Sequence, residues 1–406
     1  MTTVVKKFGG SSVGSIERIQ RVADRVIADR KNNARIVVVV SAMGDTTDEL
    51  VSMAGQISES PDPREYDALI STGENISAAL LSMTLISKGQ PAISLSGMQA
   101  GVMTDGRHVK AKILDVKPQR IEKELDEGKV VIVTGFQGIN TKDFNITTIG
   151  RGGSDTSAVV LAAALNQSEC EIYTDVDGVY TTDPRMEKGA RKLTEISYDE
   201  MLELASLGAK VLHPRAVEVA KENGIELHVR SSFESSEGTR VKEASSMEVN
   251  KPVTGIALKK DEAKLSIIHI PDQPGVAGKV FSTLADAGVN VDMIVQSTEQ
   301  DGSNTITFTV SKDEYADASK VTNEVATALK AAKVDGDTTI AKVSIVGVGM
   351  ISKPGIAARM FNCLGKNGIN IQLITTSEIK VSCAIDESQG ELAVQVLHAE
   401  FELDRE

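Results

Sequence analysis

A segment that occurs twice without gaps places the strongest constraint on how this chain can fold. Residues 274–294, PGVAGKVFSTLADAGVNVDMI, align with residues 354–374, PGIAARMFNCLGKNGINIQLI, and eight of the 21 positions are identical. In each copy a strand-like run comes first (265–270 or 342–346), a helix follows Pro-Gly, and Gly-x-Asn leads into a second strand. This order predicts two tandem βαββαβ units. The glycines and asparagines match as well as the apolar positions, which argues against chance similarity.

The part of the chain before residue 231 alternates short β-branched runs with amphipathic stretches. Strands are expected at residues 4–8, 36–40, 92–95, 130–133, 171–174 and 227–229, and helices at 16–30 and 74–87. This alternation predicts an α/β domain with a mostly parallel sheet covered on both faces. Ligands of such sheets bind beyond the carboxyl ends of the strands. Residues 231–251 are rich in Ser and Glu and are expected to be a linker.

Composition narrows the possible partners and the compartment. The net charge of −13 argues against binding to nucleic acid or to an anionic membrane surface. The three cysteines have no metal-ligand spacing, so reduced thiols are expected. No apolar run appears long enough to span a membrane, and the first residues lack a signal-peptide core. We therefore expect a cytoplasmic protein.

A glycine-rich segment, KFGGSSVG at residues 7–14, leaves the first strand and enters a helix. Glycines let the backbone approach phosphate closely, and the helix N-terminus adds N–H groups that favour an anion. Lys7 adds a full positive charge. The segment does not match the P-loop pattern, so a different class of kinase is indicated. The alternative is a plain tight turn.

A second cluster, TTIGRGGSD at residues 147–155, precedes an Ala-rich helix expected at 156–165. Arg151 is suited to hold a carboxylate through two hydrogen bonds. Ser154 or Asp155 is suited to cap the helix. The alternative is a capped helix whose Arg151 pairs with a surface acid.

Two further segments contain candidate site residues. TDVDGVYTTDPR at 174–185 is a structured loop whose Tyr180 and Arg185 are suited to hold a base and phosphates, although loop geometry alone also explains it. GAKVLHPRA at 208–216 places Lys210 at a helix end, where lysine is common for its effect on the helix dipole. His213 precedes a proline and is expected to cap or pack. None of the five histidines falls in a metal-ligand pattern.

These segments together resemble the amino-acid kinase family, and within it the single-function aspartokinases with tandem C-terminal ACT domains. The motifs KFGGSSV, VVVVSAMGDTTDEL, STGE, RGGSD, YTTDPR and GAKVLHP occur in this order, and the repeat follows them. The resemblance implies ATP- and Mg²⁺-dependent phosphorylation of the L-aspartate β-carboxylate to 4-phospho-L-aspartate, the first step towards lysine, threonine and methionine. It implies a catalytic domain at residues 1–245 and two ferredoxin-like ACT domains at 246–336 and 337–406.

The resemblance also implies roles for individual residues. The catalytic residues would be Lys7, Asp155 and Lys210. The ATP site would contain Lys7, Phe8, Gly9, Gly10, Ser41, Thr174, Asp175, Tyr180, Asp183, Arg185, Lys210 and Val211. Aspartate would contact Thr47, Glu74, Arg151, Gly152, Gly153 and Ser154, with Arg151 on the α-carboxylate and Glu74 on the α-ammonium. No residue is assigned as a metal ligand.

The repeat implies regulation by an amino acid, with lysine, threonine or both as effectors. Effector contacts are expected in the loop after the first strand and in the Asn-containing second strand, from Asp272, Gly275, Ala277, Asn290, Asp292, Met293, Ile294, Gln296, Asn370, Ile371, Thr375, Ser377 and Glu378. The asparagines alternatively serve left-handed turns. ACT domains of this family bind effectors between chains, so a homo-oligomer is expected. An internal start at Met247 would add a separately made regulatory chain.

Two other functions are compatible with parts of this pattern. Another amino-acid kinase would share the glycine loop, but not the combination of RGGSD, GAKVLHP and the repeat. A catalytically inactive amino-acid sensor would bind effector alone. The presence of Lys7, Glu74, Arg151, Asp155 and Lys210 argues against such a sensor.

Overall fold

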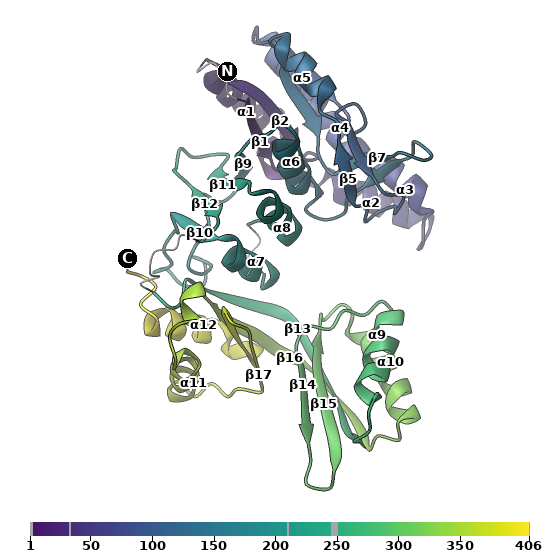
Figure 1. The fold of residues 1–406 in the computed structure, drawn as a ribbon, viewed down its shortest axis with the longest axis vertical. Helices are drawn as coiled ribbons and strands as arrows, with labels where there is room; N and C mark the ends of the chain where they lie inside the picture. The colour runs from purple at the N-terminus through teal and green to yellow at the C-terminus, as the bar shows by residue number, and fades with distance from the viewer. Residues whose placement is uncertain (1–2, 32–33, 209–210, 245–250, 406) are drawn as a thin grey trace. The chain divides into compact units, whose positions relative to one another are not determined.

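The computed structural model describes residues 3–31, 34–208, 211–244 and 251–405, and these residues form two compact units (Figure 1). The first unit comprises Met1–Val179, Lys192–Ala205 and Lys210–Ser246. The second comprises Tyr180–Arg191, Ser206–Ala209 and Met247–Glu406. Each unit is described by itself below.

An eight-stranded sheet forms the centre of the first unit, in the order β10-β12-β11-β9-β1-β2-β6-β3. Its strands are β1 (Thr3–Phe8), β2 (Arg35–Val40), β3 (Ala92–Leu95), β6 (Val130–Thr134), β9 (Glu169–Thr174), β10 (Glu195–Ser197), β11 (Glu226–Ser231) and β12 (Thr239–Lys242). From β11 to β3 every pairing is parallel. All six predicted strands are present, and the mostly parallel sheet is confirmed.

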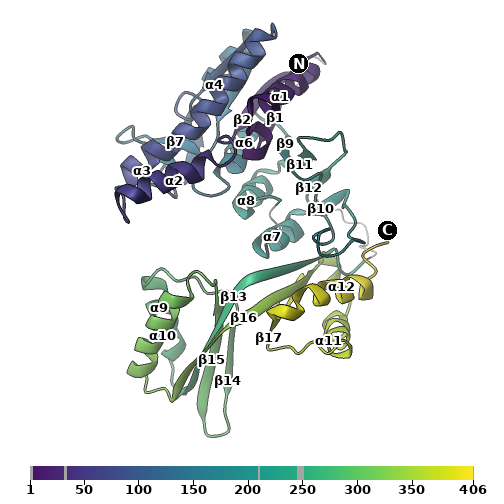
Figure 2. The same ribbon diagram turned by 180° about the vertical axis from the view of Figure 1, so that it is seen from behind.

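Helices cover both faces of this sheet because its strands are apolar on both sides. The helices of this part of the chain are α1 (Ile16–Arg30), α2 (Thr46–Ile57), α3 (Pro63–Ile70), α4 (Thr72–Ser87), α5 (Gln119–Asp126), α6 (Gly153–Ala164), α7 (Tyr198–Ser206) and α8 (Pro214–Asn223). Helices α1 and α4 pack with Phe8, Val38 and Ile132 in one core cluster (Figure 2). Side chains alternate along a strand, so Lys7 points to the opposite face, which α6 covers.

A second sheet has four strands in the order β5-β4-β7-β8. It is joined to the carboxyl end of β6 in the first sheet. It consists of β4 (Val102–Thr104), β5 (Ile113–Val116), β7 (Gln137–Asn140) and β8 (Ile146–Thr148). Strand β8 ends directly before residues 149–153, and β7 follows β6 after two residues. The sheet therefore positions residues 149–153 relative to the carboxyl end of β6.

The second unit contains one six-stranded sheet, in the order β14-β15-β13-β16-β18-β17. Its strands are β13 (Gly255–Pro271), β14 (Ile294–Thr298), β15 (Ser303–Val310), β16 (Lys333–Val346), β17 (Leu373–Thr376) and β18 (Lys380–Asp386), and its helices are α9 (Val276–Asp286), α10 (Tyr315–Ala328), α11 (Ile356–Lys366) and α12 (Gly390–Glu400). Both repeats have the expected order of elements. The long strands β13 and β16 run through both ferredoxin-like halves, and residues 336 and 337 both lie inside β16.

Some local expectations need correction. Residues 231–251 are not simply a linker, because β12 pairs with β11 there and buries Val241 completely. The Ala-rich helix begins at Gly153 rather than at residue 156, and its N-cap is Gly152 without a side-chain hydrogen bond, so neither Ser154 nor Asp155 caps it. In the repeats, the second strands begin at Ile294 and Leu373, after the asparagines.

Burial explains the state of the cysteines and of one long apolar segment. All three cysteines are unpaired and buried, as expected for reduced thiols. Among the described residues, Pro63–Ser87 is long and apolar enough to cross a membrane by length and composition, which the sequence analysis missed. Core helices of soluble proteins pass the same test, and half of this segment is buried as α3 and α4.

Candidate active site

The glycine loop forms a tight connection at the carboxyl end of β1. The Gly9 N–H donates to the Tyr173 carbonyl (3.1 Å), and Gly10–Val13 form a short 3₁₀ turn. A Cβ atom on Gly10 would lie 2.9 Å from the Ala42 carbonyl oxygen, so a larger residue there requires the backbone to shift. The loop is therefore packed directly against the segment that follows β2, at the edge where parallel sheets bind ligands.

Lys7 and Asp155 form an ion pair beside this loop. The Lys7 Nζ lies 2.5 Å from Asp155 Oδ1, and the two residues are 8% and 9% exposed. Lys7 is on β1 and Asp155 is in the first turn of α6, so the pair joins the sheet to the helix above it. A Cβ atom on Gly9 would lie 3.4 Å from the same Nζ. The structure thus places the ammonium group next to the glycine loop, where it can attract phosphate.

Glu74 is a buried carboxylate with one unused oxygen. It is 3% exposed in the first turn of α4, and its Oε1 accepts a hydrogen bond from the Ala42 N–H (3.1 Å). Its Oε2 has no hydrogen-bond partner within the described part of the chain. Burial raises the pKa of Glu74 to about 7, although the backbone N–H donors act in the opposite direction. A cationic ligand at Oε2 would favour the ionised form.

Arg151 is exposed in the loop of residues 149–153, which we call the RGG loop. Over the residues that the structure describes, its guanidinium has no ion pair, so the alternative partner, a surface acid, is not found among them. The loop is tightly held all the same. Gly152 has a φ of +69° that favours glycine, and a Cβ atom there would lie 2.1 Å from Cγ of His213. The structure therefore holds the backbone next to Arg151 against His213.

Ser154 and Gly153 connect the RGG loop to the end of β6. A Cβ atom on Gly135 would lie 2.7 Å from the Ser154 Cβ, and Gly135 donates its N–H to the Val40 carbonyl (3.0 Å). Gly153 is buried against Phe136. The predicted aspartate residues Gly152, Gly153 and Ser154 are therefore next to the ends of β2 and β6. Thr47 is partly exposed in the first turn of α2.

The predicted nucleotide residues on the first unit lie at the ends of three adjacent strands. The Ser41 N–H donates to the Phe8 carbonyl (3.1 Å), and Thr174 is the last residue of β9 and donates its hydroxyl to Asp175 (3.0 Å). The Phe8 ring is buried and stacks on Tyr173, so this side chain belongs to the core. Val211 is partly exposed.

Other predicted nucleotide residues lie on the second unit or outside the described residues. Tyr180, Asp183 and Arg185 belong to Tyr180–Arg191, which is part of the second unit. There the exposed Arg185 guanidinium donates to the Asp183 carboxylate (2.7 Å). Lys210 lies outside the described residues, as does Met247.

The effector candidates lie on loops and edge strands of the second unit, except for Ala277, which lies in the first turn of α9. Asp272 accepts from the Asn304 amide (2.9 Å), and Asp292 pairs with the buried Lys342. Met293 is 2% exposed and packs in a core cluster with Ile340 and Ala384. The others are exposed or partly exposed: Gly275, Ala277, Asn290, Ile294, Gln296, Asn370, Ile371, Thr375, Ser377 and Glu378.

The asparagines of the repeat do not serve left-handed turns. Gly288 and Gly368 adopt that conformation, with φ values of +78° and +70°, and Asn290 and Asn370 do not. Both asparagines are exposed. Their side chains therefore remain available for a ligand.

Sequence reasoning missed Asp67, a completely buried carboxylate of α3. It accepts hydrogen bonds from the Thr148 hydroxyl (2.6 Å) and the Val109 N–H (3.0 Å), and its Oδ2 lies 2.6 Å from His108 Nδ1. Thr148 ends β8, directly before the RGG loop. No local pattern marks Asp67, because an acid on an amphipathic helix normally faces water.

The described residues offer no protein cage for a metal at this site. The one group with ligand spacing in the described chain, Glu169, Glu171 and His228, has its carboxylates paired with Lys6, Arg230 and Arg240. The Asp155 carboxylate lies beside the glycine loop, and Lys7 already pairs with it. This fits Mg²⁺, which usually binds through substrate phosphates, water and only one or two carboxylates.

Comparison with protein families agrees with this arrangement of fold and site. The amino acid kinase family matches residues 2–231, and ACT domains match residues 265–329 and 343–401. A mostly parallel sheet with a glycine loop at its edge, joined to tandem ferredoxin-like units, is thus an amino acid kinase fused to ACT domains.

Relatives define the branch of this family. The chain is 52% identical over 405 residues to the aspartate kinase Ask_LysC of Stutzerimonas stutzeri, covering 100% of this chain and 98% of the relative. It is 52% identical over 406 residues to the aspartokinase of Geobacillus stearothermophilus, with the same coverage. The chain belongs to the aspartokinases.

Solved structures lead to the same branch. Aspartate kinase from Synechocystis has 49% identity and a TM-score of 0.55, covering 99% of this chain and 70% of that chain. E. coli aspartokinase III in complex with aspartate and ADP has 26% identity and a TM-score of 0.80, covering 98% and 99%. The same enzyme with lysine and aspartate has 28% identity and a TM-score of 0.77, again covering 98% and 99%.

Proposed function

We propose that this chain transfers the γ-phosphoryl group of ATP to the β-carboxylate of L-aspartate, giving 4-phospho-L-aspartate. The observation that carries the substrate assignment is a pair of complementary unpartnered groups. Glu74 offers a buried carboxylate oxygen without a donor, and Arg151 offers a guanidinium without an acid, each within the described residues. An α-amino acid presents an ammonium and a carboxylate, which these two groups complement.

In this proposal Arg151 binds the α-carboxylate and Glu74 the α-ammonium. Thr47, Ser154 and the backbone of Gly152 and Gly153 fix the remaining orientation. Removing Arg151 leaves a desolvated carboxylate without its partner, so Arg151→Ala is expected to cost about 2–5 kcal/mol of transition-state binding. The measurement is kcat/KM for aspartate. A near-normal value in that variant would remove Arg151 from the site.

The chemistry requires little proton transfer. A β-carboxylate with an ordinary pKa of about 3.9 is already ionised at neutral pH, so it attacks phosphorus without a general base. The enzyme must bring two anions together and stabilise charge on the transferring group. Lys7, held by Asp155, and the N–H group of Gly10 would supply that stabilisation, with Gly9 allowing the close approach of the phosphates, and Lys210 would add a second cation. Mg²⁺ would neutralise the β- and γ-phosphates when bound.

The nucleotide would extend from the glycine loop along the ends of β1, β2 and β9. Phe8 and Ser41 lie at the ends of β1 and β2, Thr174 and Asp175 lie at the end of β9, and Val211 would join them in the nucleotide site. The motif resemblance also assigns Tyr180, Asp183 and Arg185, which belong to the second unit, to nucleotide binding. This assignment follows the motif order in the sequence, with ADP bound in E. coli aspartokinase III as a precedent.

The ACT domains would regulate this reaction by binding lysine, threonine or both. E. coli aspartokinase III binds lysine, which supports an amino acid as the effector. We assign residues 1–245 to the catalytic domain and residues 246–336 and 337–406 to the two ACT domains. The protein would act in the cytoplasm as a homo-oligomer joined through these domains, with an additional regulatory chain if Met247 is a start site.

The deciding experiment measures hydroxylamine-trappable acyl phosphate with ATP and Mg²⁺. Aspartate should give hydroxamate, glutamate should not, and lysine, threonine or both should suppress the signal. Product from glutamate instead would indicate another amino-acid kinase. A folded protein that binds effector but gives no product from any acidic amino acid would be a sensor.

A further inference from the structure

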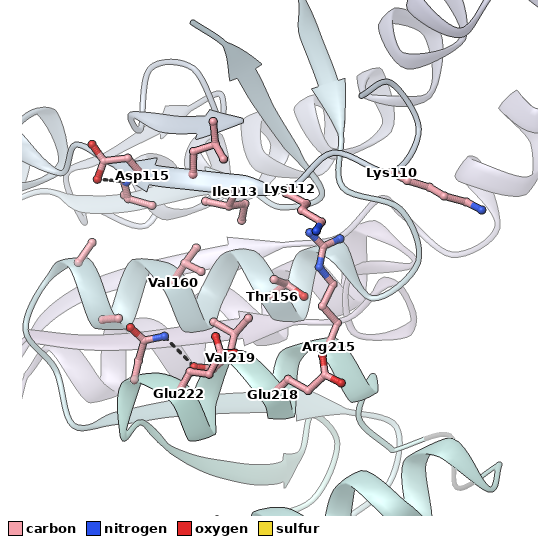
Figure 3. Close-up of a pocket in the computed structure, with 15 residues that line it drawn as sticks. Lys110, Lys112, Ile113, Asp115, Thr156, Val160, Arg215, Glu218, Val219 and Glu222 are labelled. Atoms are coloured by element: carbon pink, nitrogen blue, oxygen red, sulfur yellow. Dashed lines mark hydrogen bonds between the residues drawn. The ribbon is translucent and has the colours of Figure 1, made fainter. Parts of the chain in front are cut away.

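The N-terminus of α8 reaches the RGG loop through Arg215. Its Nη1 donates to the Ile149 carbonyl (2.7 Å) and its Nη2 to the Ala111 carbonyl (2.8 Å). Figure 3 shows this side chain extending from α8 across the groove between α8 and the segment that contains Lys112. Both acceptors are backbone groups, and Ala111 itself donates to the Thr148 carbonyl (3.0 Å). One guanidinium therefore ties together two segments that meet at the start of the RGG loop.

The same helix end contacts the other side of the loop through His213. This residue is the N-cap of α8, and its ring accepts from the Arg215 N–H (3.3 Å). The ring fills the space in which a Cβ atom of Gly152 would lie. Ile149 and Gly152 are thus both fixed by one tripeptide, His-Pro-Arg, and Arg151 lies between them.

Without these contacts the RGG loop would have many accessible backbone conformations. Gly150 and Gly152 have φ values of +87° and +69°, and glycine loses more conformational freedom on ordering than any other residue. Within the described ranges, the exposed Arg151 side chain makes no hydrogen bond or ion pair that would orient the loop. The backbone on either side therefore sets the point from which this side chain extends.

We propose that Arg215 is a positioning residue for aspartate, which aims Arg151 at the substrate α-carboxylate by holding the Ile149 and Ala111 carbonyls. This inference rests on the proposed role of Arg151. A forked guanidinium is needed because two acceptors on different segments must be bound at once. Lysine at this position can keep one of the two bonds as a point donor. A methionine keeps the apolar stem and neither bond.

The first test compares Arg215→Met and Arg215→Lys with a matched control, Glu222→Gln, which lies exposed in the same groove on the same helix. Small misplacements of a binding group cost up to about 100-fold. We expect Arg215→Met to raise KM for aspartate at least about tenfold, and Arg215→Lys to fall between it and the wild type. KM for ATP should stay within about twofold in all three variants, and Glu222→Gln should match the wild type. Thermal unfolding of each variant checks the fold.

The second test is a double-mutant cycle with Arg151→Ala. If Arg215 acts through Arg151, Arg215→Met should change KM for aspartate little in the Arg151→Ala background. Additive effects would overturn the proposal, as would equal changes in KM for both substrates. If Arg215→Met does not fold, Arg215→Lys decides alone, and an unchanged KM for aspartate in that variant overturns the proposal. A normal Arg151→Ala enzyme is a separate outcome, which removes the aspartate assignment itself.

Discussion

At the scale of single residues, the site contains two kinds of charged group. Some are held in ion pairs, and others have no partner among the described residues. Lys7 is fixed by Asp155, whereas Glu74 and Arg151 each keep a free group in the described part of the chain. Fixed charges need no reorganisation during phosphoryl transfer, and free ones are ready for a ligand. This division matches a phosphate site beside an amino-acid site.

Glu74 predicts how aspartate use depends on pH. Its pKa of about 7 belongs to the free enzyme, and the substrate ammonium needs the ionised form. As pH falls below about 7, Glu74 becomes protonated and kcat/KM for aspartate should fall about tenfold per pH unit. A pH profile from 5.5 to 8.5, in ~0.5-unit steps, measures this.

The matched variant for that profile is Glu74→Gln, which keeps the size of the side chain. It should lose about 2–3 kcal/mol of transition-state binding at pH 8, because a neutral amide replaces a charged acceptor. Its profile should also lose the step near pH 7. A step of the same size in the variant would assign the titration to another group.

Replacing Gly152 should lower stability through both backbone strain and a steric clash with His213. Gly152→Ala adds about 1–2 kcal/mol for a left-handed alanine and places a Cβ atom 2.1 Å from His213. Gly128→Ala is the control, since it has a φ of +81° and nothing within 4 Å. Urea unfolding should show a larger loss of stability for Gly152→Ala, and only that variant should raise KM for aspartate. Equal losses in the two variants would contradict the contact with His213.

At the scale of elements, the sequence predicted the strands that are buried on both faces of the sheet. The strands β1, β2, β6 and β9 are apolar runs with β-branched residues, so they were found within two residues at each end. The strands of the small sheet have three or four residues each and were missed. Such short pairings are held by their neighbours rather than by local propensity, so their sequence carries little signal.

The segment Tyr180–Arg191 belongs to the second unit and contains three of the proposed nucleotide residues. The Thr181 hydroxyl lies 3.0 Å from His398 Nε2 on α12, and Gln395 donates to the Met186 carbonyl (3.0 Å). Thr181 and His398 are 1% and 2% exposed. The regulatory helix α12 thus holds the loop that contains Tyr180, Asp183 and Arg185.

Thr181→Val tests whether this anchor matters for the nucleotide. The variant keeps the shape of the side chain and leaves a buried imidazole nitrogen without its partner, at a cost of about 1–3 kcal/mol. We expect KM for ATP to rise several-fold and KM for aspartate to stay unchanged. Thr327→Val, on the exposed side of α10, is the control and should alter neither constant. An unchanged KM for ATP in a folded Thr181→Val enzyme would show that the loop does not need the anchor.

At the scale of the whole molecule, the order of motifs predicted the family and the two kinds of unit. What it did not predict is how distant residues meet. Lys7 pairs with Asp155, and Asp67 bonds to Thr148, across separations that no periodic pattern records. The shared strands β13 and β16 were also invisible, because their sequence reads as two separate strands belonging to consecutive repeats.

Among the effector candidates, Asp292 offers a direct test of where the inhibitor binds. Asp292 precedes β14 and pairs with Lys342, which is 3% exposed and also lies 3.4 Å from Glu262. Asp292→Asn therefore removes one effector candidate without leaving Lys342 unpaired, so the fold and the uninhibited kcat should be preserved. The concentration of lysine or threonine needed for half inhibition should rise at least about tenfold, as expected for a lost charge-assisted contact. Asp301→Asn, in the exposed β14–β15 turn, is the control and should leave inhibition unchanged. Inhibition curves that coincide for Asp292→Asn and the wild type would place the effector elsewhere on the ACT domains.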